Sequence, residues 1–223
     1  MDNKHNRLSF CLYYDYTKSS NFFDNFNEPL NDDIMKYLQV SKSIVFGRKF
    51  NQLVDNLPSG IKSIEFGEKF NQPIDNLPDT IEEILFGDRF NQSIDFLPKN
   101  LKKIIFSQCS IFNQPMNNLP QSLKIISLSH NYNQNIDNLP DSVETIRIGV
   151  DRFEKSYYYA DTNAKFNHVI NKLPKSLLEI YVLDTYPYLE QLKQKIPNFE
   201  YIENGANYFH EGRNVCIIKL FRI

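Results

Sequence analysis

The chain has 223 residues, of which 41% are hydrophobic and 23% charged, so it is long and apolar enough to fold around a buried core. Its net charge of −2 gives no general attraction for nucleic acid or for anionic membranes. The three cysteines, Cys11, Cys109 and Cys216, are odd in number and far apart, which excludes a disulfide framework and a zinc site. No signal peptide is recognisable, and no stretch has the roughly 20 apolar residues of a membrane span. These features predict a cytoplasmic protein.

The first residues read as the cap of a larger array. Residues 8–16 are rich in β-forming side chains and could cover the exposed core of a first repeat. Phe26-Asn27-Glu28-Pro29 reads as a degenerate repeat with a short helix inserted after it. We therefore assign residues 1–40 to an N-terminal β cap that contains a degenerate first repeat.

A unit of about 20 residues then recurs along most of the chain. Phe-Asn-Gln stands at 50–52, 70–72, 90–92 and 112–114, followed by Tyr-Asn-Gln at 132–134 and Phe-Asn-His at 166–168. Leu-Pro begins seven residues after each of these aromatics, at 57, 77, 97, 119, 139 and 173. Because this spacing is the same six times, the chain is a repeat protein.

Each unit also contains one short strand. After each Leu-Pro, apolar residues are spaced so that the last two alternate with one outward residue, which is the period of a β-strand. The central residues of these strands are Ile44, Ile64, Ile84, Ile104, Ile126, Ile146 and Ile180. We expect about seven stacked coils in a right-handed, leucine-rich-repeat-like β-solenoid, with a parallel sheet on one face and residues 41–184 as the repeat domain.

The last part of the chain departs from this pattern. Fourteen additional residues separate the fifth and sixth repeats and predict an insertion loop at 150–165. Residues 188–196 have helical spacing and 215–221 read as a strand. Residues 185–223 are therefore expected to form a helix–strand cap over the last coil.

The repeat resembles the FNIP repeat, a relative of the leucine-rich repeat, over residues 44–183. This resemblance implies a curved solenoid that serves as a non-catalytic interaction module, of a kind known from social amoebae and large DNA viruses of amoebae. For a viral member it implies the host cytoplasm. Some relatives carry an F-box and look like substrate receptors of ubiquitin ligases. Residues 30–38 weakly echo an F-box opening helix, but the strand at 44–46 leaves no room for the rest of that domain.

Two polar columns invite a ligand interpretation. The repeated asparagines, Asn51, Asn71, Asn91, Asn113, Asn133 and Asn167, are best interpreted as a ladder that bonds the backbone of adjacent coils. Four residues further on stand Asp55, Asp75, Asp95, Asn117, Asp137 and Asn171, which could suggest calcium. The unit lacks the glycine-rich spacing of calcium-binding β-helices, and these side chains are good turn formers. We expect no metal, no cofactor and no enzyme activity, because no catalytic or phosphate-binding arrangement is present.

The outward strand residues are the candidate binding surface, because they change from coil to coil while the inward residues barely vary. Leu85, Ile105 and Ile125 are expected to form a small exposed apolar patch with charges around it. Three tyrosines in the insertion loop could be interface anchors or could pack back onto the coil. The candidate partner-binding residues are Glu65, Glu83, Leu85, Lys103, Ile105, Ile125, Arg147, Tyr157, Tyr158, Tyr159 and Tyr181.

Three functions remain open at this point. The first is a protein-interaction scaffold that binds an unknown protein partner through the strand face and the loop, as a monomer or with weak self-association. The second is a substrate receptor of a ubiquitin ligase, in which residues 26–40 would contact an adaptor. The third is a structural component that packs against copies of itself.

Overall fold

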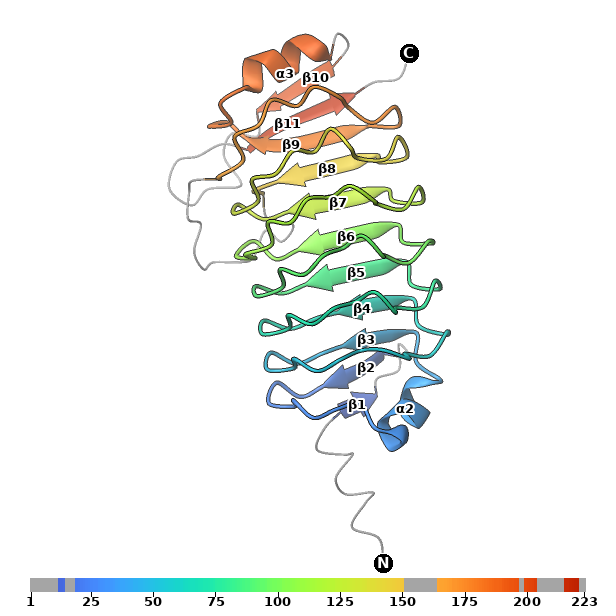
Figure 1. Ribbon diagram of the computed structural model, residues 1–223. Coiled ribbons are helices and arrows are strands. Elements are labelled where there is room, and N and C mark those ends of the chain that lie inside the picture. Colours follow the sequence, from blue (N-terminus) through green and yellow to red (C-terminus); the bar gives the residue numbers. More distant parts are fainter. Residues whose placement is uncertain (1–11, 15–18, 151–163, 197–198, 204–214, 221–223) are drawn as a thin grey trace, which may run out of the picture.

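The computed structural model describes residues 12–14, 19–150, 164–196, 199–203 and 215–220. It is an elongated stack of coils, each of which contributes one strand to a continuous sheet and returns along an irregular path on the opposite side (Figure 1). Two strands precede the repeats, β1 (Leu12–Tyr14) and β2 (Ser19–Phe22). The repeats contribute one strand each: β3 (Ser43–Val45), β4 (Ser63–Glu65), β5 (Glu83–Phe86), β6 (Lys103–Phe106), β7 (Ile125–Leu128), β8 (Thr145–Ile148) and β9 (Glu179–Leu183). Two further strands, β10 (Phe199–Glu203) and β11 (Val215–Leu220), complete the set.

The sheet has the order β1-β2-β3-β4-β5-β6-β7-β8-β9-β11-β10. All seven predicted repeat strands, β3 to β9, pair in parallel, and β2 joins them as one more parallel strand. At the two ends the direction reverses, because β1 is antiparallel to β2 and β11 is antiparallel to both β9 and β10. The parallel leucine-rich-repeat-like solenoid expected from the sequence is therefore confirmed.

Two short helices lie at opposite ends of the stack (Figure 1). Helix α2 (Asp32–Leu38) is capped by Asn31, whose side chain accepts a hydrogen bond from the backbone N–H of Ile34 at 3.0 Å. Its residues Ile34 and Leu38 are buried in the common core. Helix α3 (Leu189–Lys195) buries Leu189 and Leu192 beside the last coil.

Aromatic rings fill the core of the first coils in two adjoining columns. One column stands at the strand ends, with Phe22, Phe46, Phe66, Phe86 and Phe106, and the other contains the repeat aromatics from Phe26 to Tyr132. Within one coil the rings stack closely, with centroids 3.9 Å apart for Phe66 and Phe70. Such offset stacking adds to the free energy of burying each ring. The stacked aromatics thus hold successive coils in a fixed spacing.

Glycine follows the strand where the coils approach most closely. A Cβ atom on Gly67 would lie 2.2 Å from the carbonyl oxygen of Gly47, and one on Gly87 would lie 2.3 Å from that of Gly67. No side chain fits at such a distance, so these glycines are required by the stacking. The backbones of successive coils are therefore in direct contact at this turn.

Candidate functional site

The strand face is formed by the residues on either side of each buried central isoleucine. In β4 and β5, for example, Ile64 and Ile84 are fully buried, while their neighbours are partly or fully exposed. In-register pairing aligns these neighbours in rows across the sheet. The sequence-predicted residues of the repeat strands therefore share one face, as the strand period requires. Of these, Glu65 is exposed, and Glu83, Leu85, Lys103, Ile125, Arg147 and Tyr181 are half-buried.

The prediction of an exposed apolar patch is wrong for its central residue, Ile105. Ile105 is only 6% exposed, because it lies in register between Leu85 and Ser127 on neighbouring strands. Adjacent parallel strands are about 4.8 Å apart, so a branched side chain between two others is screened from water. Leu85 and Ile125, which are only half-buried, remain the accessible apolar residues of this set.

Charged groups lie on both sides of these apolar residues. Lys103 forms an ion pair with Glu83 in the adjacent coil. Further along the sheet the guanidinium of Arg147 lies over the ring of Tyr181, 4.7 Å from its centroid, and the Tyr181 hydroxyl donates to Glu179 at 2.9 Å. Burial, followed by the hydrogen bond to Glu179, raises the pKa of Tyr181 above its usual value.

This cluster is suited to recognition. A partly buried Arg–Tyr pair presents a flat, amphipathic surface of the type enriched at protein interfaces. Tyr157, Tyr158 and Tyr159 lie outside the described residues, so their place relative to this face remains an expectation.

The asparagine ladder is confirmed as a structural feature. The backbone N–H of each repeat asparagine donates to the side-chain oxygen of the asparagine one coil earlier, at 2.8 Å for Asn71 to Asn51 and 2.9 Å for Asn91 to Asn71. The ladder begins at Asn27, whose side-chain oxygen accepts from the backbone N–H of Asn51. It continues to Asn167, whose backbone N–H donates to the side-chain oxygen of Asn133. These side chains satisfy backbone groups that would otherwise be unpaired, which is a structural role.

The aspartate column also bonds within the array. Asn76 donates to Asp55 at 3.1 Å, and Asn118 donates to Asp95 at 3.4 Å. Partial burial works against ionisation of Asp137, but hydrogen bonds from Lys172 and Asn171 outweigh it and lower its pKa. Among the described residues no group of three or more His, Cys, Asp or Glu side chains could hold a metal ion. Nor does any described helix have the length and apolarity to cross a membrane.

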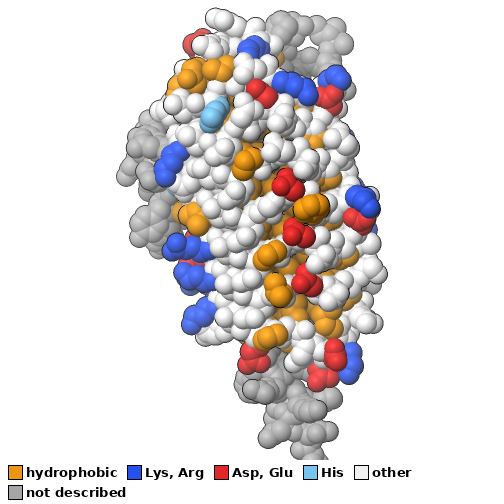
Figure 2. Space-filling view, viewed as in Figure 1, with side chains coloured by type: hydrophobic (Ala, Val, Ile, Leu, Met, Phe, Trp, Pro, Cys, Tyr) orange, Lys and Arg blue, Asp and Glu red, His pale blue; other side chains and the backbone are white. Residues whose placement is uncertain are grey.

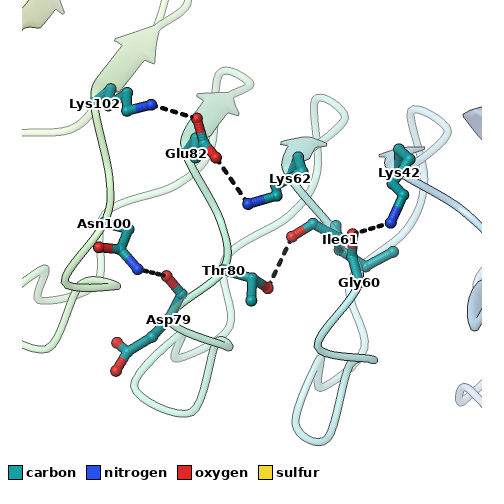
Figure 3. Close-up of polar contacts among 9 residues, drawn as sticks. All are labelled: Lys42, Gly60, Ile61, Lys62, Asp79, Thr80, Glu82, Asn100 and Lys102. Carbon is teal, nitrogen blue, oxygen red and sulfur yellow. Dashed lines mark hydrogen bonds and ion pairs between the residues drawn. The ribbon is translucent and has the colours of Figure 1, made fainter.

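Lateral ion pairs run along one edge of the stack. Figure 3 shows Glu82 between Lys62 and Lys102, with N–O distances of 2.8 and 2.7 Å. Hydrogen bonds from Lys102 and then Lys62 lower the pKa of Glu82 to about 2. The same figure shows hydroxyl and amide bonds to the backbone of the preceding coil, from Thr80 to Ile61 and from Asn100 to Asp79. These contacts join neighbouring coils, which is a structural role.

Two exposed apolar side chains on the return side were missed by the sequence reasoning. Leu53 is 56% and Phe96 68% exposed, although the corresponding repeat positions are mostly polar or proline. The signal was available, because Phe96 stands where Asn56, Asn76, Asn118 and Asn138 stand in other coils.

A groove of about 450 Å³ lies at the carboxyl ends of β2 to β5, beside the stacked glycines. Its lining carries four carboxylates, Asp24, Glu65, Glu68 and Asp88, and one cation, Arg48, which bonds to Glu68 at 3.0 Å. Hydrogen bonds from Lys69 and Arg48 lower the pKa of Glu68. The groove is therefore acidic, and Arg48 neutralises only part of its charge.

Parallel strands stacked one per coil, joined by an asparagine ladder, define a leucine-rich-repeat-like solenoid. The family model of the FNIP repeat matches residues 50–84, 70–109 and 112–151, so this part of the chain consists of FNIP repeats.

One solved structure with a similar sequence is CroV588, described as a novel circular LRR protein. It shares 25% identity with this chain and covers 76% of it, with a TM-score of 0.43. The match extends over 34% of CroV588, so the present chain spans about a third of that protein. No curated protein matches the chain significantly.

Proposed function

We propose that this protein is a non-catalytic scaffold that binds a partner protein through the strand face. The observation that carries the proposal is the contrast between the two sides of each strand. The inward residues are a nearly constant isoleucine, while the outward ones include carboxylates, cations, aliphatic groups and a tyrosine. A fixed backbone with a variable outer surface suits the recognition of one particular partner.

Arg147 and Tyr181 are the proposed centre of this surface. They are half-buried, mutually stacked and close to Glu179, so a partner group placed against them would be partly desolvated. Aromatic and arginine side chains in such positions dominate the binding free energy of many interfaces. The insertion loop with its three tyrosines is proposed to contribute to the same partner.

The ubiquitin-ligase alternative receives less support from residues 26–40. They include α2, whose apolar residues Ile34 and Leu38 are 2% and 0% exposed and belong to the solenoid core. They are consequently not available to an adaptor subunit. We therefore retain the scaffold function and leave the ligase role to the experiment.

The test is affinity purification of the tagged chain from its native host cell. The double variant Arg147→Ala, Tyr181→Ala should lose the partner that the wild type captures. The matched control is Lys62→Ala, Lys102→Ala, which removes two long side chains from the lateral edge and should retain it. If the strand-face variant keeps every partner while its thermal stability is unchanged, the strand face is not the binding surface. Recovery of ligase adaptors would favour the second function, and recovery of the chain itself as its only partner would favour the third.

A further inference from the structure

The return face, defined as residues 53–56, 73–76, 93–96, 115–118 and 135–138, carries an unbalanced negative charge. It contains Asp55, Asp75, Asp95 and Asp137 and no lysine, arginine or histidine. Figure 2 shows this side of the molecule, with acidic and hydrophobic side chains together along its middle and basic ones at the margins. The charge is therefore not neutralised within the face, in contrast to the ion-paired lateral edge.

Phe96 interrupts the hydrogen bonding of this face. In the neighbouring coils the asparagine at the same position donates to the coil before it, as Asn76 does to Asp55 and Asn118 to Asp95. The side chain of Phe96 has no hydrogen-bond donor, so Asp75 receives no bond from the following coil. Among the described residues Asp75 has no other side-chain hydrogen bond or ion pair. An exposed carboxylate thus lies one coil from an aromatic ring that is 68% exposed.

This combination fits a cationic partner. A guanidinium or ammonium group gains from contact with a ring face and from a nearby carboxylate, and it gains more when both are present. Leu53 adds apolar surface on an adjoining coil, 56% exposed. The same carboxylates would repel an anionic ligand.

The spacing of the coils favours a partner with a row of cations. The repeat aromatics, which precede the return face in each coil, are 6.0–6.2 Å apart in successive coils. An α-helix presents side chains on one side about every 5.4 Å, and alternate residues of an extended strand are about 6.6–6.8 Å apart. Flexible arginine or lysine side chains absorb either difference, so a segment with cations along one side can match successive coils.

A second copy of this chain is a poorer occupant. A second copy has a net charge of −2, and several of its cations are already engaged, since Arg48 bonds to Glu68 at 3.0 Å and Lys69 pairs with the same carboxylate. A separate basic segment loses no such ion pair when it binds. We propose that the return face, with Phe96 and Asp75 at its centre, binds a segment of a partner protein that presents lysine or arginine side chains in a row along one side.

The experiment measures fluorescence anisotropy with two alanine-rich helical probe peptides of identical composition. One carries arginines at successive i, i+4, i+7 positions, so that they line one side, and the other spreads them around the helix. The wild-type chain should bind the one-sided probe at least several-fold more tightly, and the binding should weaken as salt is added. Equal binding of both probes would overturn the proposal.

The decisive variant is Phe96→Asn, which installs the residue that the other coils carry and can restore the hydrogen bond to Asp75. It should fold normally and bind the one-sided probe about tenfold more weakly. Leu178→Asn is the control, because Leu178 is 39% exposed but lies outside the return face. It should leave the binding unchanged, and so should Arg147→Ala on the strand face, which separates this proposal from the one above.

The oligomeric state completes the test. Light scattering across a concentration series should show the same mass for the wild type and for Phe96→Asn. A dimer that Phe96→Asn dissociates would overturn the proposal, because it would identify the occupant as a second copy. Unchanged affinity of Phe96→Asn for the one-sided probe would overturn it as well.

Discussion

The first and last coils of the array share the same parallel strand pairing but have different cores. From Phe22 to Phe112 both inward positions hold stacked phenylalanines, with centroids 3.9–4.1 Å apart within a coil for the pairs from Phe46–Phe50 to Phe106–Phe112. Beyond that point the strand-end positions hold Leu128, Ile148 and Val182, which are equally buried. The asparagine ladder passes through both parts without a break.

This difference separates two requirements of the fold. The ladder, which is common to both parts, sets the connection of one coil to the next. The phenylalanine columns run through units of 20 and 22 residues, and the first of these units also contain the glycines at 47, 67 and 87. The extra two residues of the longer unit lie between Phe106 and Phe112, which still stack with centroids 4.1 Å apart. The 14-residue excess follows Ile148, where the strand-end column is aliphatic. Aromatic stacking therefore accompanies small changes of repeat length, and the long insertion stands in the aliphatic part.

The largest expected effect compares one repeat position in the two parts. Phe70→Ala removes a ring stacked on Phe50, Phe66 and Phe90, while Phe166→Ala removes one that meets Tyr186 and His168 only at a tilt. Both should lower the free energy of unfolding by about 3–5 kcal/mol, because both leave a cavity. The loss for Phe70 should exceed that for Phe166 by about 1 kcal/mol, owing to its stacked pairs. Chemical denaturation measures both, and equal losses would remove the distinction between the two parts.

The second effect tests the close approach of the first coils. Gly67→Ala forces a methyl group to within 2.2 Å of the Gly47 carbonyl oxygen, so the free energy of unfolding should fall by about 3 kcal/mol or more. Gly60→Ala is the matched control, since the nearest atom to its Cβ is 3.6 Å away. It should change stability by less than about 1 kcal/mol. A tolerated alanine at 67 would show that the coils can separate at no cost.

A third change should stabilise the protein at the junction of the two parts. The hydroxyl of Tyr132 is buried and has no hydrogen-bond partner among the described residues, and burial raises its pKa well above the usual value. Tyr132→Phe restores the repeat consensus and removes an unsatisfied group, so we expect a gain of about 1 kcal/mol in thermal or chemical denaturation. A loss of stability would mean that a bound water satisfies the hydroxyl.

The smallest effect concerns the lateral ion pairs. Lys102 and Lys62 hold the pKa of Glu82 at about 2, below its ordinary value of 4.5. A carboxylate with a lowered pKa contributes stability above pH 4.5, and this contribution is lost as the pH falls through about 2. Lys102→Ala should raise the pKa toward the ordinary value, as measured by NMR titration of the side chain. The change in stability should be small, because these groups are in water.

Most of the fold could be predicted from the repeat, but the functional faces only in part. The spacing of Ile44, Ile64 and Ile84 identified the strands, and that of Asn51 and Asn71 identified the ladder, because each depends on period alone. The burial of Ile105 could not be predicted, since it depends on which side chains lie beside it in the sheet. Phe96 was visible as a departure from the repeat, yet its exposure beside an unpaired Asp75 required the register between coils.

The sequence by itself determined a stacked solenoid with a constant core, because a unit that recurs with invariant spacing can bury its apolar residues only against copies of itself. Only the tertiary structure decided which departures from the repeat are exposed and which neighbours they have. Contacts between coils join residues about 20 positions apart, and their distances depend on how closely the backbones stack. Those distances left Ile105 covered, Asp75 without a partner, and Phe96 open to solvent on the return face.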